Sequence, residues 1–248
     1  YPSKSGVLGI LLCAMGVHRE DSRDALKRLT PLLMGVRIDR SGTLDWDYHS
    51  AGAKFGIRSA DGKIKKTAST GEYETLLSRR QYLYDASFLV ALRGDTTIIV
   101  ACASALRSPT WPLFLGRKCC VPAEPIYAGT GSFGTLSDAL ASVPWRSRNW
   151  DDRGMTRILD TFMEHRQGSP APAGARLVYD VQRGFGFYNH GPRWVVPGQV
   201  TVTVDEDMQK RAATPHRDPY GPGWDELRLS RLEIDHGLCV FCKSPAVD

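Results

Sequence analysis

Apolar and small residues at the start of the chain recur at helical spacing. The spacing predicts an amphipathic helix over about residues 5–16, with Ser3 or Ser5 as its N-cap. The side of this helix that lacks large side chains would let it lie close to another backbone. The apolar face consists of Val7, Ile10, Leu11 and Ala14, and the small-residue side consists of Gly9, Cys13 and Gly16.

Helical and strand patterns then follow one another along the chain. Asp21 or Ser22 is expected to cap a second helix that runs to about Leu33, and residues 36–38 alternate like a strand. Residues 82–92 give the clearest alternation and predict a central strand. Further helices are expected over residues 97–106 and 135–143, an edge strand over residues 121–128, and other strands over residues 176–181, 186–188 and 200–204. This order predicts an α+β sandwich of the split βαβ kind.

Residues 43–81 form a long polar segment with too few apolar residues for a core of its own. One interpretation is a solvated, mobile loop, because long segments without a pattern are often disordered. The other is a nucleic-acid-binding finger, because basic residues such as Lys54 and Arg58 are interspersed with aromatic ones such as Trp46 and Tyr73. The basic side chains would meet phosphates, and the rings would stack on bases.

The composition narrows the class of protein only moderately. The chain has 248 residues, 42% of them hydrophobic and 24% charged, which is typical of one large globular domain with or without appendages. A formal net charge of +5 permits a nucleic-acid partner without requiring one.

The 6 cysteines include the adjacent pair Cys119 and Cys120, and this usage without a signal peptide predicts a reducing, cytoplasmic location. The longest apolar run, around residues 7–17, is too short to span a membrane.

Three separated blocks of the sequence resemble one known family. They read YPSKSGVLGILLCAMGVHRED at the start, YLYDASFLVAL in the middle and FLGRKCCVPAEPIY further on. In this order and at these separations they are similar to the CasD family, the subunit of type I-E CRISPR Cascade that grips the 5′ handle of the guide RNA. The resemblance extends over residues 1–204. Family members usually carry a first strand and a turn ahead of the first block, and this chain departs from them there.

The resemblance implies a fold, a role and a set of partners. The fold is an RRM-like, ferredoxin-like palm of the RAMP type over residues 1–204, with residues 44–81 inserted as a β-hairpin thumb. The role is to bind crRNA and to cap the backbone filament in antiviral defence, without chemistry of its own. The partners are the crRNA, the backbone subunit CasC, the large subunit CasA, the processing subunit CasE and, through the complex, target DNA.

The resemblance also implies which residues contact RNA. In the third block, Gly116 would let the backbone approach a phosphate while Arg117 and Lys118 neutralise its charge. Without the family, Arg117 and Lys118 would be interpreted as a solvated basic pair. In the first block, the amides at the helix start would suit a phosphate, with Lys4 beside them. The expected set is Ser3, Lys4, Ser5, Gly6, Lys54, Arg58, Gly116, Arg117 and Lys118.

A rival interpretation is a guide-processing endoribonuclease, because some relatives cut precursor guide RNA with a Tyr, a Lys and a His near the handle. Metal-independent cleavage needs a base for the 2′-hydroxyl and an acid for the leaving oxygen. Cys119 follows Lys118 where such a His is expected, and no histidine is near this loop in the sequence. We therefore expect a non-catalytic palm. The remaining candidates lack a partner at regular spacing and are each interpreted as surface or packing residues: His18 after the first helix, His49 in the thumb, and the isolated His165 and His190.

The last part of the chain departs from the family. Residues 205–226 are charged and rich in Pro and Gly, and they are interpreted as a linker. Residues 227–248 begin with a basic amphipathic segment, and the Cys-x-x-Cys knuckle that follows resembles the opening of an HNH nuclease. Cys239 and Cys242, with His236 as a less regular third ligand, would supply part of a structural zinc site.

A lone Cys-x-x-Cys pair is also compatible with two free thiols at a chain end. Because the chain opens at Tyr1 without Met and stops at Asp248 just after this pair, we expect the natural protein to extend at both ends. The catalytic histidines of an HNH domain would then follow Asp248. Three hypotheses stay open: a guide-RNA-binding scaffold subunit, that scaffold with a C-terminal HNH DNA nuclease, and a guide-processing ribonuclease.

Overall fold

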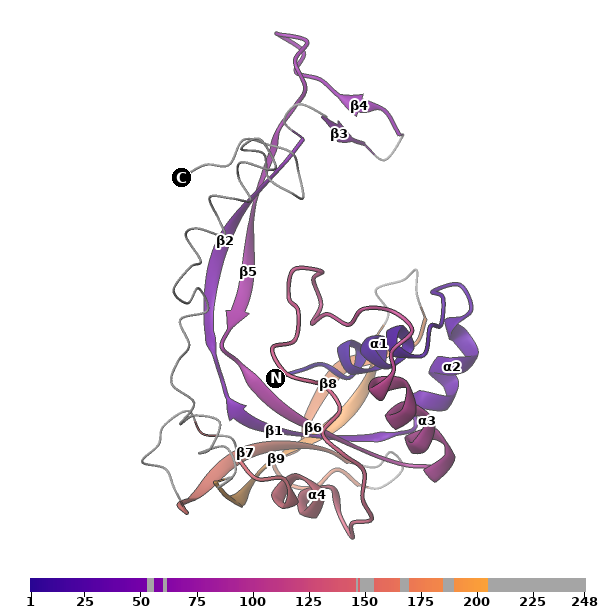
Figure 1. Ribbon diagram of the computed structural model, residues 1–248, viewed down its shortest axis with the longest axis vertical. Helices are drawn as coiled ribbons and strands as arrows, with labels where there is room; N and C mark the ends of the chain where they lie inside the picture. The colour runs from indigo at the N-terminus through magenta and orange to yellow at the C-terminus, as the bar shows by residue number, and fades with distance from the viewer. Residues whose placement is uncertain are drawn as a thin grey trace, which may run out of the picture. The chain divides into compact units, whose positions relative to one another are not determined.

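The computed structural model describes residues 1–52, 56–59, 62–145, 147, 154–165, 170–184 and 190–204. Helices and strands are mixed along the chain, which confirms the expected α+β class (Figure 1). The helices are α1 (Lys4–Ala14), α2 (Ser22–Leu29), α3 (Thr96–Arg107) and α4 (Leu136–Ser142). The strands are β1 (Leu33–Arg40), β2 (Thr43–Ala51), β3 (Ile57–Arg58), β4 (Ile64–Lys65), β5 (Leu76–Tyr84), β6 (Ser87–Arg93), β7 (Thr156–His165), β8 (Arg176–Gln182) and β9 (His190–Thr203).

A curved sheet of 5 strands in the order β6-β1-β7-β9-β8 forms the body of the fold (Figure 1). Strand β1 pairs antiparallel with β6 on one side and with β7 on the other, and β8 pairs antiparallel with β9. The first strand of the chain therefore lies inside the sheet, between strands that come later in the sequence. Strands β6 and β8 are its edges.

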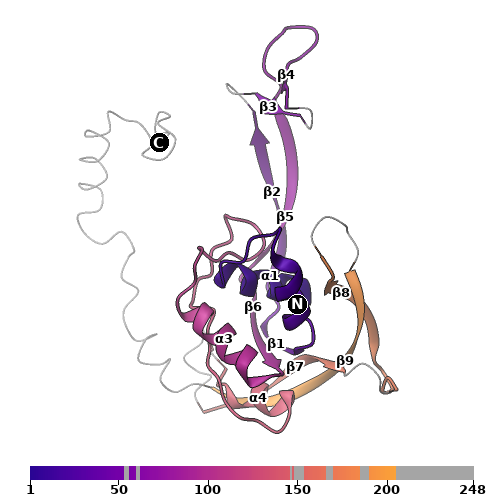
Figure 2. The same ribbon diagram turned by 90° about the vertical axis from the view of Figure 1, so that its right-hand side faces the viewer.

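The main core lies among the first three helices. Helix α1 contacts α2, α3 and strand β8. Figure 1 shows α1, α2 and α3 close together, and Figure 2 shows α1 and α3 from another side. The helix begins where Ser3 Oγ accepts the backbone N–H of Gly6, as expected for an N-cap. Leu11 and Ala14 of the expected apolar face are buried, whereas Val7 and Ile10 are only partly so. The other buried residues of α1 are Lys4, Leu8 and Leu12. The shared core cluster comprises Leu8, Leu11, Leu12, Leu26, Leu29, Leu32 and Cys102.

Helix α4 packs against β1 and β6. A Cβ on Gly35 would lie 3.2 Å from Leu140 Cδ1, so the glycine gives the helix room to approach the strand. The guanidinium of Arg37, fully buried, donates hydrogen bonds to the backbone carbonyls of Leu140 and Val143 at the end of this helix. A charge-assisted cap of this kind satisfies carbonyls that have no partner within the helix.

The polar segment after β1 forms a long hairpin rather than a loop. Strands β2 and β5 pair antiparallel from Thr43 opposite Tyr84 to Ala51 opposite Leu76, and we call this pair the ribbon. Figure 1 shows the ribbon continuing from β1 and β6, with the small β3–β4 pair near its far end. The expected β-hairpin thumb is thus present, and the alternative of an unstructured loop is wrong for these strands.

Two predictions about strands were wrong. Residues 82–92 do not form one central strand, because the left-handed backbone of Asp85, with a φ of 56°, separates β5 from β6. Strand β6 is an edge of the sheet. Alternation has the same period on both sides of a tight turn, so the pattern did not reveal the break. Residues 121–128 form no strand, since Pro122 and Pro125 lack the N–H groups that a ladder needs.

The remaining elements agree with the sequence more closely. Helix α3 is capped by Asp95, whose carboxylate accepts from the backbone N–H of Thr97, and α4 is capped by Thr135. Helix α2 ends at Leu29 rather than at about Leu33, because Pro31 disfavours a helical conformation just before it. Strand β7 was not predicted, and the expected strand at residues 186–188 lies outside the described residues.

The described residues 144, 145, 147, 154–156, 203 and 204 belong to a second unit. Among its described residues, Trp145 donates its backbone N–H to Thr203 at 2.9 Å and Val204 donates to Met155 at 3.2 Å. The expected linker at residues 205–226 and the expected domain at residues 227–248 lie outside the described residues. Within the part of the chain that the structure describes, no helix is both long and apolar enough to cross a membrane.

Candidate nucleic-acid interface

The loop of residues 113–120 is held in a compact turn by its own backbone. The N–H of Leu115 donates to the carbonyl of Cys120 at 2.7 Å, and the N–H of Cys120 donates to the carbonyl of Arg117 at 2.8 Å. Gly116 has a φ of 85°, a conformation that glycine adopts at little cost. No atom lies within 4 Å of the position that a Cβ on Gly116 would take. The exposed side of the turn is therefore open to an approaching group.

Arg117 joins this loop to the ribbon. Its Nη1 donates to the backbone carbonyl of Gln81 at 3.0 Å, and its guanidinium carbon lies 4.6 Å from the centre of the Tyr82 ring. A guanidinium has five N–H donors, and this bond uses one of them. Lys118, beside it, is exposed. The expected basic pair is thus placed where the loop meets the base of β5.

A chain of polar groups lies next to Arg117. The hydroxyl of Tyr82 is 2.7 Å from His49 Nε2 and 3.6 Å from Cys119 Sγ, and His49 Nε2 is 3.3 Å from Asp47 Oδ2. Asp47 and His49 alternate along β2 and share one face of the ribbon with Tyr82 of β5. We call Asp47, His49, Tyr82 and Cys119 the polar chain. It connects the ribbon with the loop.

The polar chain changes the acidity of the Cys119 thiol. The hydrogen bond from Tyr82, with smaller contributions from Cys120 and the positive charge of Arg117, lowers the pKa of Cys119 below the ordinary thiol value. The same bond is the main reason that the pKa of Tyr82 is raised. Both shifts have the direction expected when the Tyr82 hydroxyl donates to the sulfur of Cys119. Burial instead raises the pKa of the neighbouring Cys120.

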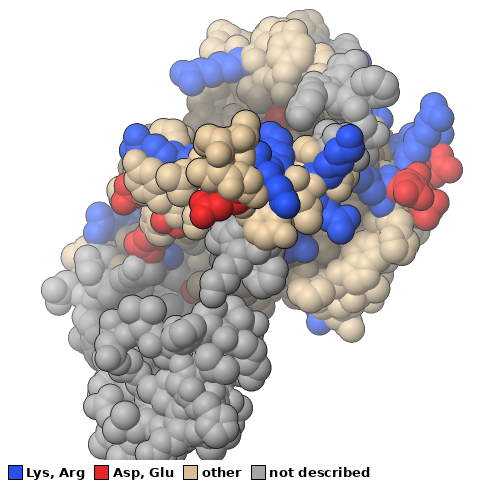
Figure 3. Space-filling model, turned by 90° about the horizontal axis from the view of Figure 1, so that it is seen from above, with Lys and Arg blue, Asp and Glu red and all other residues tan. Residues whose placement is uncertain are grey.

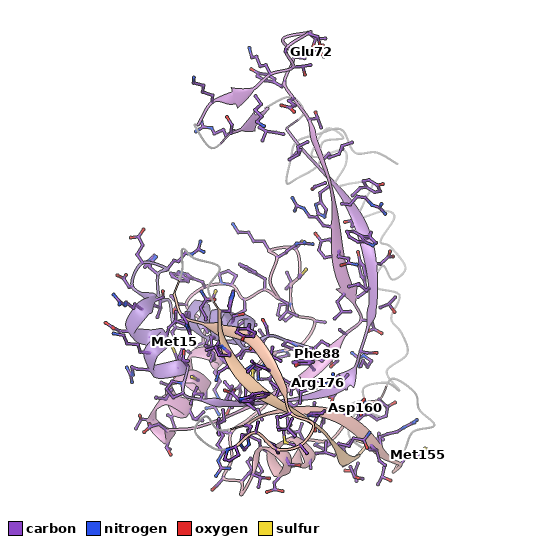
Figure 4. All side chains as sticks on the ribbon, turned by 180° about the vertical axis from the view of Figure 1, so that it is seen from behind. Met15, Glu72, Phe88, Met155, Asp160 and Arg176 are labelled. Carbon is purple, nitrogen blue, oxygen red and sulfur yellow. The ribbon has the colours of Figure 1, made fainter. Side chains whose placement is uncertain are left out.

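The opposite face of the ribbon presents aromatic rings. Trp46 and Tyr48 are 51% and 67% exposed, and the Arg79 guanidinium carbon lies 5.4 Å from the centre of each ring. Leu44 and Leu83 are exposed on the same face, and Figure 4 shows side chains projecting from both sides of the strands. Exposed rings with a cation between them are typical of surfaces on which unpaired bases stack.

The side chain of Lys4 is not available for RNA, which corrects the prediction made from the first block. Lys4 is buried, and its ammonium lies 2.8 Å from Glu164 Oε1 and 2.9 Å from Oε2. Its backbone N–H donates to Asp180 Oδ2 at 2.8 Å. Asp180 also binds Arg193, at 2.6 Å and 2.8 Å. A carboxylate of the protein itself therefore occupies the helix start where a phosphate was expected.

The other residues of the first block have mostly structural roles. Ser3 caps α1 through Gly6 and lies 3.1 Å from the hydroxyl of Ser5. A Cβ on Gly6 would meet Ser3 Oγ at 3.2 Å. Ser3 and Gly6 are exposed and Ser5 partly so, so their role in RNA binding stays a prediction.

Three of the expected site residues lie outside the described residues: Lys54 in the thumb, and Cys239 and Cys242 in the tail. Arg58 is described, is exposed and belongs to β3. In the part of the chain that the structure describes, no group of three or more His, Cys, Asp or Glu residues is placed to hold a metal ion. The zinc expectation rests on the tail, so it stays a prediction.

His49, interpreted as a surface or packing histidine, has a partner that its position in the sequence did not reveal. The fold brings it from β2 to within hydrogen-bond distance of Tyr82, and through Tyr82 to the loop of Lys118. His18, in contrast, packs its ring edge-on against Trp111 at 4.9 Å, as a packing histidine would. Spacing along the sequence did not reveal the His49 contact, because His49 and Tyr82 are 33 positions apart, and Tyr82 and Cys119 are 37 positions apart.

On the face that Figure 3 displays, Lys and Arg side chains are separated by uncharged and acidic residues. Cations lie over exposed rings where Arg79 meets Trp46 and Tyr48 and where Lys66 meets Tyr73, and Arg117 lies over the partly buried ring of Tyr82. Sequence reasoning missed Tyr82 and Arg79 as site residues, and only the β2–β5 register would have found them.

Comparisons with known proteins identify the family of the chain. A family model described as CRISPR-associated protein (Cas_Cas5) matches residues 1–212. The CRISPR system Cascade subunit CasD of Escherichia coli (strain K12) is 30% identical over 141 residues. That match covers 52% of this chain and 59% of CasD, so the chain spans less than two thirds of the relative's length.

Solved structures give the same result for the fold. A chain of a structure described as "CRISPR RNA-guided surveillance complex" superposes with a TM-score of 0.64 at 25% identity, covering 86% of this chain and 87% of the other. A second structure, described as "Crystal structure of Cas protein", gives a TM-score of 0.54 at 31% identity, with 80% of each chain covered. The expected RAMP-type fold is consistent with both.

Proposed function

The chain belongs to the CRISPR-associated Cas5 family, and on that premise we propose that it is the Cascade subunit that binds the 5′ handle of the guide crRNA. The name of the relative CasD states that it is a subunit of Cascade, and the proposal assigns this chain to the same kind of complex. Such a complex acts on nucleic acids inside the cell, so we place the protein in the cytoplasm. No reaction is assigned to the palm.

The single observation that carries the proposal is the junction between the loop and the ribbon. Gly116 gives the loop an open backbone, Arg117 is fixed on Tyr82 and Gln81, and Lys118 is exposed beside it. A backbone that can be approached closely, together with two adjacent cations, suits the phosphate of a bent single strand. The aromatic face of the ribbon would stack on bases next to that phosphate.

We further propose that the ribbon contacts the other components of the complex. Leu77 is 69% exposed and Leu44 is 58% exposed, which is unusual for leucines of a lone subunit. An adjoining CasC backbone subunit would cover this apolar surface, so that the chain caps the backbone filament. CasA, CasE and target DNA would then contact the chain only in the assembled complex.

Binding to two RNAs of equal length tests the proposal. One RNA carries the guide with its 5′ handle, and the other has the handle scrambled, so both offer the same number of phosphates. We expect the handle RNA to bind at least about tenfold more tightly at physiological salt, because contacts with its bases and its shape add to the affinity that phosphate contacts provide. Equal affinities would remove handle recognition from this chain and leave general RNA attraction.

A second candidate function, guide processing, is favoured by one observation. His49 is 2.7 Å from Tyr82 and 3.3 Å from Asp47, which is an arrangement able to hold and move a proton beside Lys118. If the chain processes guides, it should cut precursor RNA in the presence of EDTA, and His49→Gln should slow the cut by roughly a hundredfold or more. Intact precursor RNA after incubation with the unaltered protein would dismiss this candidate.

We also propose that residues 227–248 open an HNH nuclease domain with a zinc knuckle at Cys239 and Cys242. Support for this proposal comes only from the Cys-x-x-Cys spacing in the sequence. A chain extended past Asp248 should bind one zinc ion and nick guided DNA with a divalent metal, whereas the chain ending at Asp248 should do neither. An extended chain that contains no zinc and leaves the plasmid intact would reject the HNH proposal.

A further inference from the structure

The cysteines that the structure describes differ sharply in their surroundings. Cys102 is buried in the core and burial raises its pKa, while Cys13 directs its sulfur to the carbonyl of Pro112 at 3.6 Å. Cys119 and Cys120 are adjacent in the loop, where Cys119 is exposed and Cys120 is half-buried. Only Cys119 among these four combines exposure with a polar partner on another element, the Tyr82 hydroxyl at 3.6 Å.

The Tyr82 hydroxyl, which contacts Cys119, has one proton to donate and two possible hydrogen-bond acceptors. Tyr82 lies between His49 Nε2 and Cys119 Sγ, at 2.7 Å and 3.6 Å. When His49 carries a proton on Nε2, near the carboxylate of Asp47, Tyr82 has no acceptor on that side and its O–H is directed to the sulfur. Arg117, whose guanidinium lies over the Tyr82 ring, adds a positive charge to the same site. These groups favour the thiolate form of Cys119.

We propose that Cys119 is a modification site at which low-molecular-weight disulfides form a mixed disulfide, and that this adduct weakens RNA binding by the loop of Arg117 and Lys118. The second half of the proposal rests on the proposed function, because it needs the loop to bind RNA. The first half stands on the geometry of Cys119 alone. The ligand class is a small disulfide whose thiol half becomes attached to the protein.

The chemistry is a thiol–disulfide exchange. The thiolate of Cys119 attacks one sulfur of the small disulfide, a new S–S bond forms, and the original S–S bond breaks. Its electron pair leaves with the second sulfur, which takes up a proton and departs as a free thiol. The sulfur of Cys119 is oxidised and the departing sulfur is reduced, so the small disulfide is itself the oxidant. A reducing thiol reverses the step.

The adjacent Cys120 is a poor resolving partner for this adduct. The Cα atoms of neighbouring residues are about 3.8 Å apart across a trans peptide, which is shorter than the roughly 4.4 Å that an unstrained disulfide needs. The mixed disulfide at Cys119 should therefore persist instead of collapsing to a Cys119–Cys120 bridge. Cys120 then serves as a control position in the same loop, one residue away.

The adduct would act on RNA binding in two separable ways. Any group on Cys119 displaces the Tyr82 contact and occupies space beside Arg117. A glutathionyl group also adds carboxylates next to the two cations that would meet a phosphate, whereas a hydroxyethyl group is neutral. Oxidised glutathione should therefore weaken RNA binding more than hydroxyethyl disulfide does at equal labelling.

The test of the modification uses the full chain with Cys239→Ser and Cys242→Ser as background, so that tail thiols do not react. Peptide mapping after treatment with oxidised glutathione should find the adduct at Cys119, and Cys119→Ser should abolish it. Cys120→Ser should leave the rate within about twofold. Tyr82→Phe should slow it about twofold or more, because the loss of thiolate is only partly offset by the greater nucleophilicity of a more basic sulfur. Faster labelling of Cys120 or Cys13 than of Cys119 would overturn the proposal.

The test of the consequence uses handle RNA and begins with reduced protein. If the reduced chain does not bind handle RNA, the proposed function fails while the labelling result stands on its own. If it binds, the glutathionylated chain should bind at least about fivefold more weakly, and dithiothreitol should restore the affinity. Unchanged affinity of the fully labelled chain would refute the regulatory half of the proposal.

Discussion

At the scale of single residues, Lys4 of the first sequence block interacts with groups in the protein interior and is not available to RNA. The Lys4 ammonium is paired with Glu164, and both side chains are almost fully buried. Glu164 also accepts the backbone N–H of Met34 at 3.1 Å, which connects α1 to β1. Removing one member of such a pair leaves a buried charge without its partner, and this costs far more than an exposed pair contributes.

Lys4→Met should therefore lower the free energy of unfolding by about 3 kcal/mol or more. Adding Glu164→Gln should recover part of this loss, because the uncompensated carboxylate is removed. Chemical denaturation measures both. The control is Lys27→Ala, whose exposed pair with Asp24 should contribute little to stability because solvent screens it. A loss for Lys4→Met as small as that of the control would contradict the buried-pair account.

The same network makes stability depend on pH. Burial alone would raise the pKa of Asp180. The hydrogen bonds from the Arg193 side chain and the Lys4 backbone, together with the positive charges of the Arg193 and Lys4 side chains, outweigh burial and hold this pKa below the ordinary value. A depressed pKa in the folded state contributes stability above the unfolded value of 3.8, and this is lost as pH falls through the folded pKa.

Unfolding free energies from about pH 6 to about pH 3 should fall more steeply for the unaltered protein than for Asp180→Asn, which cannot titrate at this position. The variant should also be less stable at neutral pH, since Arg193 loses its charged partner. Parallel pH profiles for the two proteins would show that Asp180 is not the titrating group.

At the scale of elements, the ribbon begins at a turn with little spare room. Gly42, between β1 and β2, has a φ of 74°, and a Cβ there would lie 2.6 Å from the carbonyl oxygen of Tyr84. Both the backbone conformation and the space exclude a side chain. In α1, by comparison, no atom lies within 4 Å of a Cβ on Gly9.

Gly42→Ala should destabilise the protein by about 1–3 kcal/mol, whereas Gly9→Ala should stabilise it by about 0.5–1 kcal/mol through helix propensity. Thermal unfolding of the two variants measures the contrast, with the same chemical change made at both sites. An equal effect of the two substitutions would mean that the turn at Gly42 does not set the direction of the ribbon.

The sequence predicted helices better than it predicted the site. Capping residues such as Asp95 and Thr135 act within one turn, so α3 and α4 could be located from local pattern. Tyr82, His49 and Arg117 meet only because β2 and β5 pair in one register and the loop returns to their base. Strand register depends on partners far along the chain, and a single sequence does not display it. Lys4 was misplaced for the same reason, since Glu164 and Asp180 belong to strands far from it in the chain.

At the scale of the whole molecule, the ribbon should be the part most altered by assembly. It exposes several large apolar side chains and pairs only its own two strands, so a partner subunit and RNA would protect it. Trypsin should cut the free protein near Lys63, Lys65 and Lys66, all exposed near β4, and assembly should slow these cuts by about tenfold or more. Equal cutting rates in the free and assembled protein would argue against a buried ribbon.

The central claim is that the loop of Arg117 and Lys118 contacts the phosphates of the crRNA handle, and its most direct measurement is the salt dependence of handle binding. Each lost contact with a single-stranded phosphate should reduce the slope of log affinity against log salt by about 0.7. Arg117→Ala with Lys118→Ala should therefore weaken binding and reduce the slope by about 1.4. Arg23→Ala with Lys27→Ala removes the same charges from α2 and should leave the slope unchanged. If the loop variant keeps the slope of the unaltered protein, or if the α2 variant loses as much, the loop is not the site of phosphate contact.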